Sequence, residues 1–301
     1  MTEFQRYLLA KRTVDDRALD RRTVETLREQ VQARAGERDG PFRVLEVGAG
    51  IGTMLARLVD WDVLPTGDIH YTAVDIEPDN VAAIPGYLSE WAADSAVSVR
   101  EDPLTVAGPD RRIEVEAVAA DAVEYADDAA GEYDLLLGAA LLDILDRDGL
   151  ATLVGALAPG GSYYFPITFD GATRFRPSHP ADRAVERHYH DHMDAKPGGD
   201  SHAGGAVLER LRGMAGVTLT AVAGSDWVVR PVDGAYPADE AYFLRHILDT
   251  VEEAVGEIAD DSFGDLDPWL ARRREQLAAA ELLYHTHQLD FLGRVDPDGD
   301  G

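Results

Sequence analysis

Short apolar runs alternate with helical patterns between residue 42 and about residue 170. The runs 42–48 and 69–76 have the length and the Val, Ile and Tyr content of buried strands. Segment 79–93 carries its apolar residues at helical spacing. Further strands are predicted at 112–120, 132–140 and 160–169, and further helices at 51–60 and 147–157. The alternation predicts an α/β fold, in which helices cover both faces of a parallel sheet.

The segments on either side of this region are predicted to be mostly helical. Residues 1–40 carry Val24, Leu27 and Val31 at helical spacing. Near the other end, we expect one helix along the apolar stripe at 244–258 and a second along the stripe from Trp269 through Tyr284 and His287 to Phe291. Residues 217–232 are predicted to form an antiparallel hairpin around a Gly-Ser turn. Residues 171–205 show no periodicity.

The charge balance bears on the solvent and on the partners of the protein. Acidic residues outnumber basic ones 56 to 28, for a net charge of −28, and Lys11 and Lys196 are the only lysines. This composition is typical of haloarchaeal proteins, whose dense surface acids keep them soluble in molar salt. It predicts a halophilic, cytoplasmic protein without nucleic-acid partners, because nucleic-acid binding needs clustered cations. No apolar run approaches the roughly 20 residues of a spanning helix, so no membrane partner is expected.

The chain contains no cysteine, which excludes several kinds of structural and catalytic site. A chain without cysteine has no disulfide framework, no thiol nucleophile and no cysteine-ligated zinc. Any catalysis must therefore use other side chains.

A glycine-rich loop follows the first predicted strand. Gly48, Gly50 and Gly52 alternate directly behind a run that carries the acid Glu46. The spacing is G-x-G-x-G, which differs from the G-x-G-x-x-G of nicotinamide sites, and no G-K-[ST] of a phosphate-binding loop follows. Glu46 would repel a pyrophosphate, whereas it suits a ligand with a positive centre. S-adenosylmethionine is such a ligand, with a sulfonium and an ammonium.

These residues resemble the class I S-adenosylmethionine-dependent methyltransferases. Glu46 and the three glycines match the first motif of that family, and "EYDLLLGAALLD" and "LAPGGSYYF" match its fourth and fifth strands. The resemblance covers roughly residues 42 to 170. It implies that Asp75 binds the ribose hydroxyls and that Asp121 contacts the adenine amine. The same resemblance implies that neighbouring residues also line the cofactor site, namely Ala49, Ile76, Ala122 and Gly138.

The resemblance also implies an overall architecture. The expected fold is a doubly wound, mostly parallel seven-stranded sheet with an antiparallel C-terminal strand and helical caps at both ends of the chain. We expect an N-terminal helical lid over 1–40, a Rossmann-like core over 41–235 with an insertion at 171–204, and a C-terminal helical segment over 236–301.

The expected activity is methylation of an oxygen or a nitrogen on a small molecule. The Asn/Asp-Pro-Pro-aromatic motif of the amide and adenine methylators is replaced here by "GAALLD", and the covalent pyrimidine route needs a cysteine. Three alternatives remain open. These are a methyltransferase for a glycan or lipid precursor, an aminopropyl transferase, and a non-catalytic cofactor-binding module that could form a homodimer.

The insertion carries the candidate catalytic residues. Arg174 and Arg176 could clamp an anionic substrate, and His188 or His192 could take a proton from the attacking group. The competing interpretation is that these arginines pair with the surplus acids of the protein. The histidine pattern H-x-H-D-H is one residue short of a known metal motif, so no metal is predicted.

The N-terminal segment allows two interpretations. Lys11, Asp15, Asp16 and Arg17 could belong to a lid over the cofactor. Equally, they could form an ordinary charged helix face with pairs four residues apart, such as Arg12 with Asp16.

Overall fold

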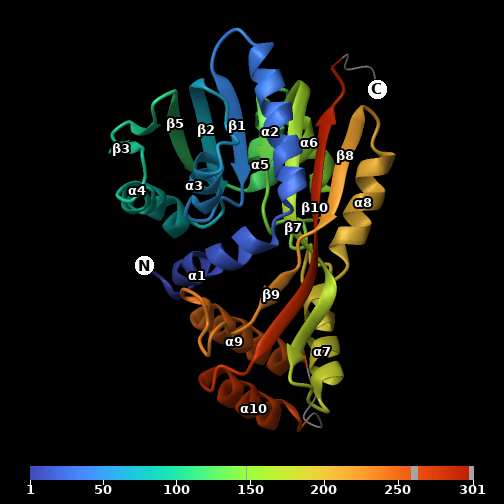
Figure 1. Cartoon of the computed structure of the whole chain (residues 1–301). Coiled ribbons are helices and arrows are strands. Elements are labelled where there is room, and N and C mark those ends of the chain that lie inside the picture. Colours follow the sequence, from blue (N-terminus) through green and yellow to red (C-terminus); the bar gives the residue numbers. More distant parts are fainter. Residues whose placement is uncertain (147, 259–263, 298–301) are drawn as a thin grey trace.

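The computed structural model describes residues 1–146, 148–258 and 264–297, and a ten-stranded sheet forms its centre (Figure 1). The strands lie in the order β3-β4-β5-β2-β1-β6-β7-β10-β8, and β9 pairs with β10. The parallel strands are β5 (Arg111–Ala119), β2 (Gly67–Asp75), β1 (Phe42–Val47), β6 (Tyr133–Leu137) and β7 (Leu157–Arg176). The antiparallel strands are β3 (Ser98–Glu101), β4 (Leu104–Ala107), β8 (Val217–Gly224), β9 (Trp227–Val229) and β10 (Leu283–Val295).

The strand order confirms the predicted doubly wound, mostly parallel sheet. The five parallel strands lie side by side, and β10 runs antiparallel between β7 and β8. Seven strands were expected from the sequence, and they correspond to β1, β2, β5, β6, β7, β8 and β9. The other three strands are β10, where a helix was expected, and the hairpin of β3 and β4, which extends the sheet next to β5. The pattern of the sequence did not predict β3 and β4.

Helices cover both faces of the sheet, as the α/β pattern predicts. Neighbouring residues on β1 point to opposite faces. Val44 belongs to the core with Leu27 and Leu55, whereas Leu45 belongs to the core with Leu153 and Leu211. The helices are α1 (Glu3–Ala18), α2 (Arg21–Gly36), α3 (Thr53–Asp60), α4 (Pro78–Ala92), α5 (Ala122–Asp128), α6 (Gly149–Gly155), α7 (Asp182–Ala195), α8 (Ala203–Gly213), α9 (Glu240–Ile258) and α10 (Leu266–Ala278).

A smaller layer of helices lies beyond the carboxyl ends of the parallel strands. The long strands β7 and β10 continue past the rest of the sheet toward α7, α9 and α10 (Figure 1). Helix α9 packs against α1, α7 and α10, and α1 also contacts α3 and β9. Helix α1 therefore lies between the sheet and the C-terminal helices, beside a segment more than 200 residues away in the chain.

The expected second C-terminal helix is wrong over its last part. Helix α10 ends at Ala278, and residues 283–295 form β10, which pairs with β7 on one side and with β8 and β9 on the other. Tyr284, His287 and Phe291, which gave the apolar stripe, therefore lie on a strand. Sheet pairing outweighed the helical spacing of these residues. The C-terminal segment thus contributes a central strand in addition to its helices.

Two further expectations about local structure are wrong. The predicted hairpin over 217–232 does not form, because β8 and β9 each pair with β10 and not with one another. The stretch at 171–205 contains the end of β7 and the whole of α7. Helix α7 has little apolar content beyond its buried Val185. The helical spacing of apolar residues is therefore hard to recognise in its sequence.

None of the helices in the described part of the chain is long and apolar enough to cross a membrane.

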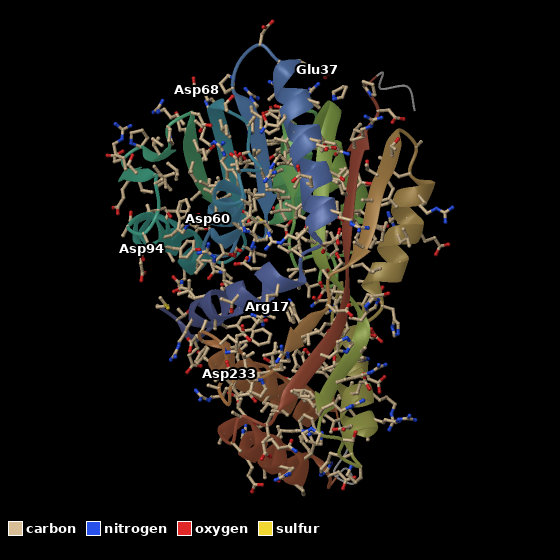
Figure 2. All side chains as sticks on the ribbon, in the orientation of Figure 1. Arg17, Glu37, Asp60, Asp68, Asp94 and Asp233 are labelled. Carbon is tan, nitrogen blue, oxygen red and sulfur yellow. The ribbon has the colours of Figure 1, made fainter. Side chains whose placement is uncertain are left out.

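We expect the stability of the fold to rise with salt. Exposed acids project from the surface, as Glu37, Asp60, Asp68, Asp94 and Asp233 illustrate along the top and left of the view (Figure 2). The net charge of −28 repels itself most at low ionic strength. Salt near 1 M reduces the Debye length to about 3 Å. The melting temperature should therefore increase from dilute buffer to molar potassium chloride, and a flat or falling trend by calorimetry would contradict this.

Candidate functional site

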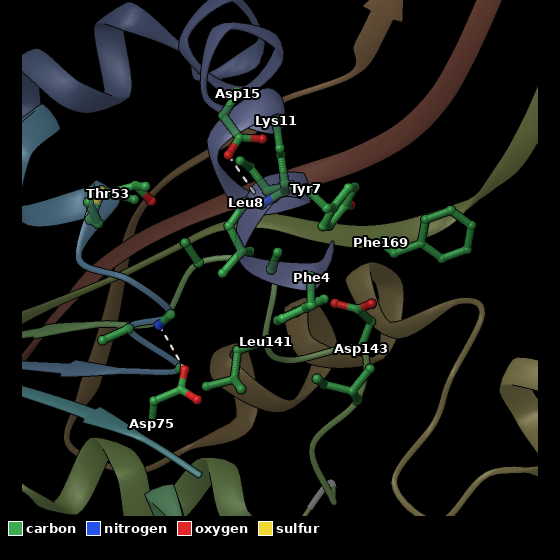
Figure 3. A pocket seen from close by; sticks show the side chains of 18 of the residues that line it. Phe4, Tyr7, Leu8, Lys11, Asp15, Thr53, Asp75, Leu141, Asp143 and Phe169 are labelled. Atoms are coloured by element: carbon green, nitrogen blue, oxygen red, sulfur yellow. Dashed lines mark hydrogen bonds and ion pairs between the residues drawn. The ribbon is translucent and has the colours of Figure 1, made fainter. Parts of the chain in front are cut away.

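A cavity of about 660 Å³ lies at the carboxyl ends of the parallel strands (Figure 3). Residues that follow β1, β2, β5 and β6 form one side of it, and residues from α1, α7, α9 and β10 form the other. Doubly wound sheets bind their ligands at this place, and the volume is typical of small-molecule sites. The cavity is therefore the candidate functional site.

The glycine loop after β1 borders this cavity. Gly48, Gly50 and Gly52 have φ angles of 65°, 56° and 88°, a region that other residues rarely adopt. A Cβ atom on Gly50 would lie 3.0 Å from Cδ1 of Leu8, which belongs to α1. Gly48, Ala49 and Gly50 line the cavity, whereas Gly52 is the N-cap of α3 and lies outside the lining.

Asp75 ends β2 and holds the glycine loop in place. Its Oδ2 accepts a hydrogen bond of 2.7 Å from the backbone N–H of Gly50. Its Oδ1 accepts hydrogen bonds from the N–H of Glu77 at 3.0 Å and from Nδ2 of Asn80 at 3.2 Å. The side chain lines the cavity and is 7% exposed. A carboxylate has about four lone-pair sites. These three hydrogen bonds use both sites of Oδ1 and one of Oδ2, so Oδ2 can still accept a hydrogen bond from a ligand.

Glu46 is a buried acid that also lines the cavity. It accepts a hydrogen bond of 2.6 Å from the hydroxyl of Tyr71 on β2. Burial raises the pKa of Glu46 to about 7, although this hydrogen bond and the Arg57 guanidinium lower it. A carboxyl group with this pKa gains a full negative charge most easily when a cation lies beside it.

The other expected cofactor residues fall into two groups. Ile76, Asp121 and Ala122 line the cavity at the ends of β2 and β5. Asp121 is the N-cap of α5, and its Oδ1 accepts hydrogen bonds from two N–H groups of that helix at 2.8 and 3.0 Å. Ile76 is 66% exposed, which is unusual for a large apolar side chain and provides a surface for a flat ligand. Gly138 lies outside the lining, and a Cβ there would come 3.1 Å from Cδ1 of Phe165.

Helix α1 closes the cavity beside the glycine loop, which its Leu8 approaches. Phe4, Tyr7, Leu8, Lys11 and Asp15 all line it (Figure 3). The position of Lys11 and Asp15 agrees with the lid interpretation.

The same helix also has the ion pairs of the second interpretation, an ordinary charged helix face. Arg12 and Asp16 form an ion pair of 3.9 Å, and Asp16 accepts a hydrogen bond of 2.5 Å from Nε of Arg57. Arg17 pairs with the buried Glu240 of α9 at 2.5 Å. Helix α1 is thus both a wall of the cavity and a bridge to α3 and α9.

The candidate catalytic residues of the insertion lie outside the lining of this cavity. Arg174 is 3.8 Å from Oε1 of Glu186, and Arg176 donates a hydrogen bond of 2.8 Å to the backbone of Phe175. His192 shares a hydrogen bond of 2.7 Å with Glu257 and borders a second, smaller cavity. His188 lies on α7 with it. The structure does not bring these four side chains together around the first cavity.

The histidines show no metal-binding arrangement in the described residues. His188, His190 and His192 lie on a helix, so alternate side chains point in different directions. On β10, His285 and His287 both approach Asp226, at 3.2 and 2.8 Å. These two were expected near the end of a helix, and that expectation is wrong.

Several residues of the lining were not expected from the sequence. They are spread over the loop after β6, α7 and β10, and comprise Asp143, Tyr189, Thr286 and Gln288. Of these, only Asp143 could have been recognised from its position in the sequence. It ends the "GAALLD" segment directly after the fourth parallel strand in chain order. Catalytic and binding residues often follow the carboxyl ends of strands.

Comparisons with known proteins find similarity only among solved structures. No family model and no curated protein matches the chain. A S-adenosylmethionine-dependent methyltransferase from Thiobacillus denitrificans, solved with S-adenosylhomocysteine, is 17% identical over 92% of both chains, with a TM-score of 0.45. The protein YjhP from E. coli is 14% identical over 96% of this chain and 98% of its own, with a TM-score of 0.44.

Phosphoethanolamine N-methyltransferase 2 from Haemonchus contortus is 15% identical, and the match covers 90% of this chain and 52% of that one, with a TM-score of 0.40. Values this low carry no statement about a site, a substrate or a partner. The strand order itself establishes the fold.

Proposed function

We propose that the protein is a cytoplasmic methyltransferase that uses S-adenosylmethionine to methylate an oxygen or a nitrogen of a small molecule. One observation carries this proposal. Glu46, Asp75 and Asp121, at or just beyond the ends of three parallel strands, face a single cavity together with a glycine loop. This is the set that a ligand with ribose, adenine and a positive centre requires.

The described residues fit the cofactor. Asp75 would accept hydrogen bonds from the ribose hydroxyls, and Asp121, held by the α5 amides, would meet the adenine amine beside Ile76. The glycine loop leaves room for the methionine moiety because its positions carry no Cβ. Glu46 supplies the buried acid for the positive centre.

The chain contributes alignment and exclusion of water. When bound, the cofactor supplies an electrophilic methyl group on a sulfonium. Helix α1 covers the glycine loop and lines the cavity through Tyr7 and Leu8, so it shields the reacting atoms. A displacement of this kind depends mainly on holding the acceptor in line with the methyl group in a dry site.

The structure gives the expected anionic substrate no support. Arg174 and Arg176 do not line the cavity, and the only guanidinium in its described lining, Arg57, is engaged by Asp16 and Asp15 at 2.5 and 3.7 Å. The competing interpretation, in which the arginines of the insertion pair with acids of the protein, agrees with the contact between Arg174 and Glu186.

Binding of S-adenosylmethionine should weaken as the pH falls below about 7. The pKa of Glu46 is raised to about 7 by burial, and a bound sulfonium favours the ionised carboxylate. Affinity should therefore drop by up to about tenfold per pH unit below that pKa and stay level above it. Calorimetry from pH 5 to 8 measures this. Tyr71→Phe should move the midpoint upward, because the Tyr71 hydrogen bond lowers the pKa.

Glu46→Gln is the matched variant for this prediction. It keeps the shape of the side chain but cannot ionise, so its affinity should be lower and nearly independent of pH over this range. An unchanged pH profile in Glu46→Gln would show that another group is responsible.

The proposed function is tested by ligand preference and transfer. Calorimetry should show that the protein binds S-adenosylmethionine and S-adenosylhomocysteine at micromolar strength, and neither NAD nor ATP comparably. Equal binding of NAD would indicate a different doubly wound nucleotide-binding protein and would refute the proposal.

A further inference from the structure

Asp143 is an isolated acid on the part of the cavity away from the glycine loop. It follows β6, and its Oδ1 is buried and accepts no hydrogen bond from the described residues. The other acids of the lining are Asp15, Glu46, Asp75, Glu77 and Asp121. Asp15 is paired with Lys11, and the others belong to β1 or to the ends of β2 and β5. Asp143 is therefore the acid of the described lining that the proposed cofactor contacts leave without a role.

A second buried acceptor lies on the same side. Gln288 is 2% exposed and lines the cavity, and its Oε1 has no hydrogen-bond partner among the described residues. It pairs in register with Phe169 on β7, whose backbone also lowers the pKa of Asp143. A buried oxygen without a donor is costly, so both oxygens are placed to accept hydrogen bonds from a ligand.

Three tyrosines line the same cavity as Asp143. Tyr7, Tyr189 and Tyr284 come from α1, α7 and β10, and all line the cavity. Burial is the main cause that raises the pKa of each, and the charge of Asp143 raises it further for Tyr7 and Tyr189. They therefore remain neutral phenols and contribute aromatic side chains to the wall of the cavity. A carboxylate within aromatic walls is the chemistry that recognises an ammonium group.

The positive groups near this side are already engaged. Lys11 forms an ion pair of 3.1 Å with Asp15 and lies 5.4 Å from the centre of the Trp227 ring. His246 stacks on Tyr7 with ring centres 4.1 Å apart, and burial lowers its pKa, so it is neutral at pH 7. Among the described residues, neither Lys11 nor His246 forms an ion pair with Asp143, although the charge of Lys11 lowers its pKa.

We propose that the acceptor is a small amine, bound as an ammonium by Asp143 and Gln288 among the three tyrosines, and methylated on nitrogen. This inference rests on the proposed function. Asp143 takes one proton from the ammonium, and the freed lone pair forms the new N–C bond. The methyl carbon–sulfur bond breaks, and its electron pair leaves with the sulfur as S-adenosylhomocysteine. The proton on Asp143 then passes to solvent.

The environment of Asp143 suits both the binding of an ammonium and the removal of its proton. Burial raises its pKa to about 6, against backbone hydrogen bonds and the charge of Lys11, which lower it. At neutral pH the group is ionised and can attract an ammonium, yet it is a stronger base than an exposed aspartate.

A second cavity provides room for the rest of the amine. It has a volume of about 330 Å³ and shares Asp143, Tyr189 and Met193 with the first. Glu253 and Glu257 line it further out, together with Lys196. Asp143 thus lies where the two cavities adjoin, and an amine with a short tail can place its nitrogen there.

The test compares three probes of matched shape, phenethylamine, 2-phenylethanol and 3-phenylpropionate. With S-adenosylhomocysteine present, calorimetry should show phenethylamine binding about tenfold or more tighter than the other two. Mass spectrometry should detect its N-methyl product when S-adenosylmethionine is supplied. Asp143→Asn should lose about tenfold in amine affinity and most of the transfer, while its affinity for S-adenosylhomocysteine stays unchanged.

Asp191→Asn is the matched control, because it removes the same charge from an exposed position of α7 outside both linings. It should behave as the wild type. Preference for 3-phenylpropionate, or amine binding by Asp143→Asn equal to that of the wild type, overturns the inference and leaves the proposed function standing. Failure of the wild type to bind S-adenosylhomocysteine overturns both.

Discussion

Replacing Asp75 by alanine should weaken the binding of S-adenosylhomocysteine by about 3 kcal/mol, or roughly 100-fold. The variant loses the charged acceptor proposed for both ribose hydroxyls. It also leaves the N–H of Gly50, which now donates to Asp75 at 2.7 Å, without its partner. The glycine loop would then keep the backbone hydrogen bond from Ala49 to Val74 but lose its contact with the Asp75 side chain. Calorimetry with purified wild type and variant measures the difference.

Asp68→Ala is the matched control for this experiment, because Asp68 lies on the same strand and is exposed. It should bind as the wild type does. Asp75→Asn keeps the size of the side chain and one acceptor oxygen. Its affinity for S-adenosylhomocysteine should therefore lie between that of the wild type and that of Asp75→Ala. Undiminished binding by Asp75→Ala, in a variant that melts as a folded protein, would remove Asp75 from the cofactor site.

The side of the cavity that we propose to hold the cofactor could be predicted because its residues come from continuous segments. Glu46, the glycines and Asp75 follow strands whose apolar runs are visible in the sequence. A parallel sheet brings the carboxyl ends of its strands to one edge, so the placement of these residues follows from the fold class. The structure places Asp75 and the loop in direct contact, through the hydrogen bond to Gly50.

The acceptor side could not be predicted in the same way. Tyr7, Asp143, Tyr189 and Gln288 come from α1, a loop, α7 and β10. Apart from Asp143, which follows the end of a strand, each is unremarkable in its own segment, and only tertiary packing brings them to one cavity. The arginines of the insertion stood out in the sequence because bases are scarce, yet scarcity says nothing about the direction of a side chain.

Strand β10 shows why one element was assigned wrongly. Its buried positions alternate, as in a strand, but Thr286, Gln288 and Asp290 are among them. Polar residues at buried positions erase the alternation of apolar and polar residues on which a strand prediction depends. Asp290 is buried because it accepts hydrogen bonds from the Ile167 N–H at 3.0 Å and the Tyr164 hydroxyl at 3.2 Å.

Arg273 joins the insertion to the C-terminal helices, and its side chain is fully buried. It pairs with Asp182 at the start of α7 and donates to the Pro177 carbonyl at 2.6 Å. Asp182 also accepts a hydrogen bond of 2.8 Å from Nε1 of Trp269. Burial raises the pKa of Asp182, but hydrogen bonds, including those from Trp269 and Arg273, outweigh it, so the pKa lies below its usual value.

Asp182→Ala should therefore lower the free energy of unfolding by about 3–5 kcal/mol, because it leaves the Arg273 charge buried without its counterion. Urea denaturation at pH 7 measures the loss. The contribution of Asp182 is present at and above its ordinary pKa, and it disappears as the pH falls through its lowered folded pKa. The difference between wild type and variant should thus persist down to about pH 4 and shrink only in stronger acid.

The double variant Asp182→Ala with Arg273→Met separates the charge from the packing. Methionine removes the unpaired cation but still fills part of the space beside the Phe175 and Trp269 rings, whose centres lie 5.8 and 5.3 Å from the guanidinium carbon. It should recover more than half of the lost stability, because an apolar replacement of a buried ion pair is often close to neutral. Asp191→Ala, on the exposed side of the same helix, should change stability little. If the double variant is no more stable than Asp182→Ala alone, the loss comes from the hydrogen bond to Trp269 and not from the buried charge.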